Sequence, residues 1–190
     1  MSTNMWEGEH VRLRGIRAGD WEHFLAWDMD SDAQRYGWQA WPPKGEEAAK
    51  AFAKTESEKK MEGGSFRLII ETLDGVPAGS ISVRGDERRR SFEYGIDLGR
   101  EFWGKGYAQE AITLACRFMF NELGYNKVQA FVYGFNERSI SMHRKLGMRL
   151  EGTMTEAQFT AGRFWDCHIF GMTAREFFER HGQGWGELRP

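Results

Sequence analysis

The middle of the chain contains three short segments of β type, and a helical segment follows them. Residues 66–72, 78–84 and 91–98 are rich in apolar and β-branched residues, and only short turns separate them. Residues 108–123 then carry apolar side chains at helical spacing. Parallel strands need a crossover of about a dozen residues or more, so strands joined this closely must pair antiparallel. The pattern therefore predicts an antiparallel meander that leads into a helix.

The same reasoning predicts the other elements of the chain. Strands are expected over residues 11–16, 128–133, 150–159 and 164–172, and helices from Asp20 past Trp27, over 46–61 and over 136–146. Residues 29–45 contain several glycines and prolines and are expected to form an irregular loop. Residues 176–190 are expected to form a loose tail. Because no repeat or linker interrupts the chain, we expect residues 1–190 to form a single α+β domain.

Charge and hydropathy exclude two classes of partner. The net charge is −2 and the pI is about 6.2, whereas domains that bind nucleic acid through their overall field are strongly basic. No apolar run approaches the roughly 18 to 20 residues that a membrane span needs. Residues 1–10 lack the apolar stretch of a signal peptide. We therefore expect a cytoplasmic location, without nucleic-acid or membrane partners.

The cysteines and histidines do not predict a covalent or metal framework. Cys116 and Cys167 both lie within apolar segments, where small buried side chains are expected instead of a disulfide. The five histidines are scattered without the spacing of metal ligands. No metal is expected.

A turn with two glycines joins the third strand of the meander to the following helix. It reads Gly104-Lys105-Gly106-Tyr107-Ala108. Backbone N–H groups at a helix N-terminus have no partner within the helix, and together with the helix dipole they attract phosphate oxygens. Glycines permit the close backbone approach that such a site requires. The turn alone is equally compatible with a connection that binds nothing.

A nucleotide-binding P-loop is a second interpretation of the same turn. Residues 99–105 match most of that pattern, G-x-x-x-x-G-K. The next residue is Gly106, however, so the hydroxyl that would hold Mg²⁺ is missing. A P-loop also begins a parallel βαβ unit, not the end of an antiparallel meander. Both observations argue against an NTPase.

Several motifs resemble those of one acetyltransferase superfamily. YGIDL at 94–98 and WGKGYAQEA at 103–111 resemble the central motif of GNAT acetyltransferases. NERSI at 136–140 and RKLGM at 144–148 resemble the second motif of that superfamily. The segment 151–166 is similar to the subgroup that includes ribosomal-protein N-terminal acetyltransferases and spermidine acetyltransferases. The order and spacing of these motifs make the resemblance specific.

The resemblance spans about residues 8–175 and implies the GNAT fold with acetyl-CoA as cofactor. That fold is a central mixed, mostly antiparallel sheet of about six to seven strands, with helices on both faces. The backbone of the splayed third meander strand would bind the pantetheine arm, and the glycine turn would hold the pyrophosphate. The residues that the resemblance assigns to the cofactor are Ile96, Asp97, Leu98, Gly104, Lys105, Gly106, Tyr107, Ala108, Asn136, Ser139 and Lys145.

Two positions depart from the family pattern. Trp103 stands where many relatives carry Gln or Arg, and His143 stands where many relatives place a tyrosine that protonates the leaving thiolate. We expect the first change to be tolerated, because backbone amides provide most of the phosphate binding. The second leaves the general acid open between His143 and the hydroxyl of Ser139, although a thiol with a pKa of about 8.5 also leaves readily as thiolate.

Acetylation of an amine also needs a base and an oxyanion donor. An alkylammonium with a pKa near 10 is only about one part in 10³ neutral at pH 7, so removal of its proton helps. Glu93 is the first candidate for the base, Asp97 the second and Glu151 a distant third. The resemblance assigns the oxyanion contact to the Leu98 N–H.

The acceptor is expected between the two N-terminal helices and the last hairpin. The aromatic residues Tyr36, Trp38 and Trp41 fall there, and so do Asp28, Asp30 and Asp32. Such a mixture suits a cationic amine, which leaves open a protein N-terminus, a polyamine or another small amine. The alternative function is a catalytically weak CoA-binding sensor or scaffold of the same fold. A homodimer is compatible with the exposed-looking final strands.

Overall fold

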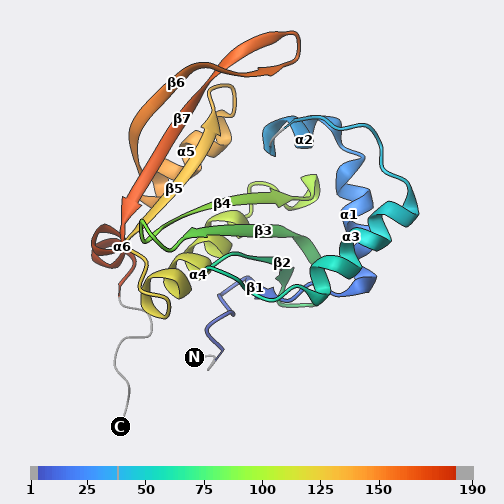
Figure 1. The fold of residues 1–190 in the computed structure, drawn as a ribbon, viewed down its shortest axis with the longest axis horizontal. Coiled ribbons are helices and arrows are strands. Elements are labelled where there is room, and N and C mark those ends of the chain that lie inside the picture. The colour runs from blue at the N-terminus through green and yellow to red at the C-terminus, as the bar shows by residue number, and fades with distance from the viewer. Residues whose placement is uncertain (1–3, 38, 183–190) are drawn as a thin grey trace.

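Seven strands form one continuous sheet in the order β1-β2-β3-β4-β5-β7-β6 (Figure 1). The computed structural model describes residues 4–37 and 39–182. The strands are β1 (Val11–Arg14), β2 (Phe66–Thr72), β3 (Pro77–Asp86), β4 (Ser91–Leu98), β5 (Lys127–Tyr133), β6 (Arg149–Thr160) and β7 (Arg163–Thr173). Neighbours pair antiparallel except β4 and β5, which are parallel. This confirms the α+β class and the mixed, mostly antiparallel sheet.

Helices cover both faces of the sheet, as expected. They are α1 (Trp21–Asp28), α2 (Ser31–Gly37), α3 (Glu46–Glu58), α4 (Tyr107–Asn121), α5 (Glu137–Leu146) and α6 (Ala174–His181), with short 3₁₀ turns at Ala18–Asp20 and Arg100–Phe102. Successive side chains of a strand point to opposite faces. Accordingly, Ile70 of β2 packs in the large core with α4, α5 and α6, while Ile69 packs with α1 and α3.

Two sequence expectations about irregular segments are wrong. Residues 29–45 are not loop throughout, because α2 occupies part of them and ends at Gly37, before the prolines. Asp30 Oδ1 accepts a hydrogen bond from the Ala33 amide at 3.0 Å, which stabilises the start of this helix. Residues 176–181 are not a loose tail but part of α6. A capping box between Thr173 and Glu176 starts α6, and its Phe177 is fully buried against α4. Residues 183–190 lie outside the described part.

Asp20 also has a different role from the one expected. It stands before α1, but its side chain makes no capping hydrogen bond there. The carboxylate instead accepts two hydrogen bonds from the Arg14 guanidinium, at 2.8 and 2.9 Å, and one from the Arg17 amide at 2.7 Å. It therefore ties the start of α1 to β1.

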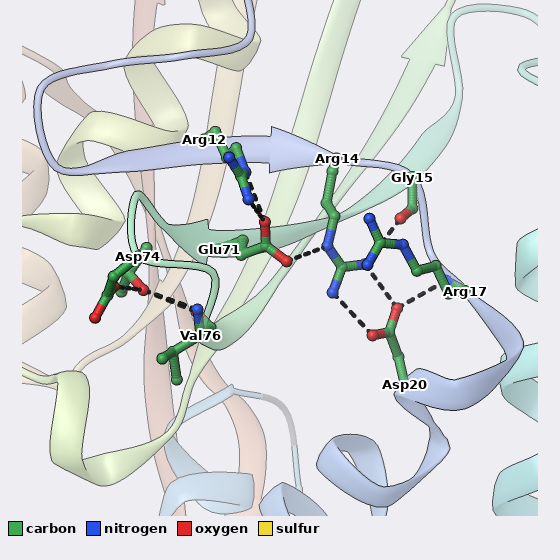
Figure 2. A network of polar contacts seen from close by, with 9 residues as sticks. Arg12, Arg14, Gly15, Arg17, Asp20, Glu71, Asp74 and Val76 are labelled. Carbon is green, nitrogen blue, oxygen red and sulfur yellow. Dashed lines mark hydrogen bonds and ion pairs between the residues drawn. The ribbon is translucent and has the colours of Figure 1, made fainter.

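A buried ion network extends from Asp20 to β2 (Figure 2). Arg14 Nε donates to Glu71 Oε1 at 2.5 Å, and Arg12 Nε donates to Glu71 Oε2 at 2.6 Å. Glu71 is only 3% exposed and Asp20 5%, because the arginines lie over them. The network joins β1, β2 and α1 at the edge of the sheet that is farthest from β5, β6 and β7.

The arginines more than offset the cost of burying these carboxylates. Burial alone would raise the pKa of Glu71, but hydrogen bonds and positive charge from Arg14 and Arg12 lower it below the usual 4.5. The pKa of Asp20 is lowered in the same way, against its burial, by Arg14 and the Arg17 amide. A carboxyl whose pKa is lower in the folded than in the unfolded chain stabilises the fold above its usual pKa. That contribution disappears as the pH falls through the folded value.

We predict that Glu71→Gln lowers the free energy of unfolding at pH 7 by about 2–3 kcal/mol, because it leaves two arginines without their shared carboxylate. The difference from the wild type should shrink as the pH falls below 4.5, the ordinary value for Glu, since the wild-type carboxyl is then protonated too. Urea unfolding at several pH values measures both effects. Glu47→Gln, at a side chain that is 88% exposed, is the matched control and should change nothing measurable. A pH-independent difference would contradict the ion-pair account.

Candidate active site

The parallel pair β4–β5 separates soon after it begins. Only Ser91, Phe92 and Glu93 of β4 pair with β5, opposite Lys127, Val128 and Gln129. From Tyr94 onward the two strands diverge, and Figure 1 shows α2 opposite the open end. We call this opening the split. It divides the sheet into one arm of β1 to β4 and another of β5, β7 and β6.

Backbone groups of β4 face into the split. The Gly99 amide donates to Ala78 O at 2.9 Å, so at this residue the backbone faces β3. Backbone groups alternate direction along an antiparallel strand, and Leu98, like Ile96, therefore turns its N–H toward the split. The Leu98 carbonyl accepts a hydrogen bond from Trp103 Nε1 at 2.9 Å. The Leu98 N–H is left facing the space that β5 has vacated.

The N-terminus of α4 opens next to this strand. Gly104 and Gly106 have φ values of 76° and 83°, a region that side chains with a Cβ rarely adopt. Gly106 is the N-cap residue, and no side chain caps the helix. Within the described residues, Gly104, Lys105 and Gly106 donate no backbone hydrogen bond, and the first amides of a helix have no partner inside it. The turn thus presents several free N–H donors and the positive end of the helix dipole.

His143 lies in the core at the base of the split. It is 3% exposed, and its ring stacks between Tyr94 of β4 and Phe170 of β7, with centroids 5.9 and 5.5 Å away. Nδ1 lies 2.7 Å from the carbonyl oxygen of Ser139 and therefore carries a proton. Burial lowers the pKa of His143, and the Ser139 carbonyl opposes this only in part. The ring is consequently neutral at pH 7, and its Nε2 is buried without a partner in the described structure.

Asn136 and Ser139 begin α5 on the second arm. Asn136 Oδ1 caps the helix by accepting from the Ser139 amide at 3.1 Å. Its Nδ2 donates to the Tyr36 carbonyl of α2 at 3.2 Å, so it also bridges to the N-terminal helices. The Ser139 hydroxyl lies 3.2 Å from His143 Nδ1. The structure thus brings together three of the predicted site residues: Asn136, Ser139 and His143.

α2 contacts both arms through aromatic rings. Tyr36 lies edge-on to Trp103 on the first arm, at a centroid distance of 6.0 Å. It also contacts Phe135 on the second arm at 5.8 Å. Trp41 follows α2 and is 54% exposed, with its amide bonded to Gln34. Trp38, also predicted to line the acceptor site, lies outside the described residues.

Most acidic residues near α2 already have cationic partners. Asp28 pairs with Lys44 at 2.7 Å, Asp30 with Arg100 at 2.6 Å and Asp32 with Arg35 at 2.7 Å. These ion pairs occupy the three carboxylates that the sequence suggested for binding a cationic amine. Sequence patterns did not indicate the pairs of Asp28 and Asp30, because Lys44 lies beyond the prolines and Arg100 is distant in the chain.

Asp97 differs from these three aspartates. Its side chain makes no hydrogen bond or ion pair with another described residue, and the residue is exposed to solvent. α2 ends against it, since a Cβ at Gly37 would lie 2.5 Å from Asp97 Oδ1. The surrounding protein desolvates the carboxylate and raises its pKa above 3.8, an effect that Arg67 opposes and Asp28 reinforces.

The other candidates for the base are engaged elsewhere. Glu93 accepts a hydrogen bond from Arg84 of β3 at 2.6 Å, in a pair whose arginine is 80% exposed. Glu151 forms an ion pair with Lys127.

The two lysines predicted to bind the cofactor lie apart from each other. Lys145 is exposed in the last turn of α5, and no contact joins its side chain to the glycine turn. Lys105 extends over the Phe102 ring at 5.4 Å.

The described residues show no candidate metal site and no candidate membrane span. They contain no group of three or more His, Cys, Asp or Glu side chains that could hold a metal ion. Cys116 and Cys167 are free and buried. No helix in the described part of the chain is long and apolar enough to cross a membrane.

Comparison with known proteins identifies the family. Residues 10–149 match the family model described as an acetyltransferase (GNAT) domain. An uncharacterized N-acetyltransferase of Bacillus subtilis, the SPbeta prophage-derived YokL, is 33% identical over 183 residues, which are 96% of this chain and 100% of YokL. The spermidine N(1)-acetyltransferase of Escherichia coli K12 is 29% identical over 157 residues, 81% of each chain.

Solved structures show the same fold. The spermidine N-acetyltransferase of Vibrio cholerae in complex with CoA and spermine superposes with a TM-score of 0.77 at 19% identity, covering 88% of this chain and 98% of that one. A putative acetyltransferase from T. thermophilus gives 0.71 at 29% identity, covering 90% of both chains. The predicted GNAT fold is therefore confirmed. This chain belongs to the GNAT family of acetyltransferases, enzymes that transfer an acetyl group from acetyl-CoA to an amine.

Proposed function

We propose that this enzyme acetylates the primary amino group of a small amine, whose single ammonium group lies beside Asp97. One observation carries the proposal. Of the four aspartates at or near α2, only Asp97 lacks an ionic partner in the described structure, because Asp28, Asp30 and Asp32 are all paired. An unpaired carboxylate beside α2 is the group that a cationic substrate would meet.

The residues around the split fit acetyl-CoA, which supplies the acetyl group as a thioester. The free amides from Gly104 to Ala108, at the positive end of α4, would hold the diphosphate. Backbone groups of Ile96 and Leu98 would bind the pantetheine arm, as a neighbouring strand would. The Leu98 N–H faces the split and would donate to the acetyl oxygen, where negative charge develops.

Asp97 is better suited than Glu93 to take the proton of the ammonium group. A base works best when its pKa lies near the working pH, and desolvation moves the pKa of Asp97 upward, in that direction. Glu93 would first have to leave its ion pair with Arg84. We therefore reverse the order that the sequence suggested and propose Asp97 as the general base.

The leaving thiolate would not receive its proton from a charged His143. The ring is neutral at pH 7, and its Nδ1 proton is held by the Ser139 carbonyl. Ser139 carries a hydroxyl in the first turn of α5, 3.2 Å from His143 Nδ1. Departure as a thiolate is also accessible to a thiol with a pKa of about 8.5. We propose that His143 positions Ser139 at the start of α5 and does not itself act as the acid.

A homodimer and a cytoplasmic location stay predictions of the sequence. Exposed apolar side chains along β6 and β7 support a homodimer, since large apolar patches in water favour association. They include Leu150, Met154, Phe159 and Phe164, which are 40 to 58% exposed. The mass of the purified chain in solution decides between monomer and dimer.

We predict that Asp97→Asn lowers kcat/KM about 100-fold for amines that are protonated at the assay pH. The loss should be much smaller for amines of low pKa, which need no base. Glu93→Gln is the matched control: it removes the same charge from the same strand and should change kcat/KM less than about threefold. A larger loss in Glu93→Gln than in Asp97→Asn would return the role of base to Glu93.

We also predict that primary amines stimulate release of CoA thiol from acetyl-CoA. In a matched series of butylamine, putrescine and spermidine, further ammonium groups should change kcat/KM by less than about fivefold, because Asp28, Asp30 and Asp32 are already paired with cations. A preference for spermidine well beyond this would indicate a polyamine site, and a preference for peptides a protein N-terminus. If CoA binds but no amine raises turnover above hydrolysis, the alternative of a CoA-binding sensor or scaffold is correct.

A further inference from the structure

We propose that Arg138, on the second arm of the split, is a ligand of the CoA diphosphate held by the glycine turn on the first arm. The inference rests on the cofactor site proposed above. Trp103 is the residue directly before Gly104 of that turn. The indole N–H of Trp103 is already bound to the Leu98 carbonyl, which fixes the orientation of the ring. Trp103 therefore offers no further donor to a phosphate.

Two guanidinium groups lie over the Trp103 ring. The Cζ atoms of Arg100 and Arg138 are each 4.9 Å from its centroid. Arg100 is neutralised by Asp30, which accepts two hydrogen bonds from it at 2.6 and 2.7 Å. The Arg138 side chain has no hydrogen bond or ion pair with any residue in the described part of the chain. Of the two stacked cations, only Arg138 is available to an anion.

The position of Arg138 on α5 is not explained by helix stability. It lies in the first turn of α5, after Asn136 and Glu137, where the helix dipole favours negative charge. Its exposed side chain nevertheless reaches from the start of α5 to a ring on the opposite arm. Stacking on an indole holds a guanidinium in one plane with its N–H groups free at the edge.

The chemistry of the group matches a diphosphate. A guanidinium donates two parallel hydrogen bonds to phosphate oxygens, and such charge-assisted bonds are among the strongest that a protein makes. The free amides of Gly104, Lys105 and Gly106 follow Trp103 directly, so an anion bound to them lies near the ring on which Arg138 rests. A diphosphate would thus be held by backbone amides of one arm and by a side chain of the other.

The test measures Kd for three ligands by titration calorimetry, for the wild type and for Arg138→Gln. The ligand that binds most weakly is measured by competition with a tighter one. CoA and dephospho-CoA both contain the diphosphate, whereas pantetheine contains no phosphate. We expect Arg138→Gln to raise Kd for CoA and for dephospho-CoA by about tenfold or more, and to leave Kd for pantetheine unchanged. Arg138→Lys, which keeps the charge but not the planar fork, should give an intermediate Kd for the first two ligands.

Arg100→Gln is the matched control. Like Arg138→Gln, it removes one positive charge and one cation–ring contact of the same length. Unlike Arg138, however, Arg100 is already paired with Asp30. We expect Kd for CoA to rise less than about threefold. An equal rise in both variants would mean that only the overall charge matters and would overturn the assignment. A rise in the Kd of Arg138→Gln for CoA but not for dephospho-CoA would also overturn it, because it would indicate contact with the 3′-phosphate. An equal rise in Kd for pantetheine, which has no phosphate, would overturn it too.

The outcome also separates this inference from the proposed cofactor site. If the wild-type chain binds CoA and Arg138→Gln binds it equally tightly, the assignment of Arg138 is wrong and the cofactor site stands. If the wild-type chain does not bind CoA, the cofactor site itself is wrong.

Discussion

β4 and β5 pair over only a few residues, and their early separation shapes the whole region between the two arms of the sheet. After three residue pairs the strands diverge, and the β4 edge loses its hydrogen-bonding partner. Backbone groups left without partners inside a protein cost about 1–3 kcal/mol each, so such an edge favours a ligand that can replace the missing strand. The parallel connection through α4 begins at the same end of β4, which places the free amides of that helix beside the free edge. One departure from regular pairing thus leaves free both the β4 edge and the first amides of α4, the two parts of the proposed cofactor site.

The two arms would be unsupported without the contacts that join them. At the base of the split, His143 of α5 stacks between Tyr94 of β4 and Phe170 of β7. At the open end, Tyr36 contacts an aromatic ring on each arm, and Asn136 donates to its carbonyl. Far from the split, the ion network around Glu71 fixes the outer edge of the sheet to α1. These contacts keep the opening at a fixed place while its backbone groups stay free.

The meander, the glycine turn and the α5 motif were predictable from the sequence because each has a local cause. Alternating apolar residues predicted the bounds of β4 correctly, and Gly104 and Gly106 indicated a turn before a helix, where both glycines have positive φ in the structure. The C-terminal end was predicted less well. α6 depends on a capping box at Thr173 and on burial of Phe177 against α4, a contact between distant segments.

The chemistry of the site was harder to predict for a physical reason. Whether a carboxylate is available depends on which cations fold against it, and Asp30 is paired with Arg100, which lies 70 positions away in the chain. The availability of Asp97, the engagement of Glu93 by Arg84 and the neutral state of His143 all arise from tertiary contacts. Sequence motifs indicated candidate residues for the site, but they could not indicate which ionic partners these residues would have.

We propose that the free β4 edge and the start of α4 together receive acetyl-CoA. Hydrogen exchange of single amides, measured by NMR with and without CoA, tests this most directly. CoA should slow exchange at Leu98 and at Gly104 to Ala108, while amides of β2 and β3 far from the split should keep their exchange rates. Unchanged exchange at both Leu98 and the glycine turn in the presence of saturating CoA would contradict it.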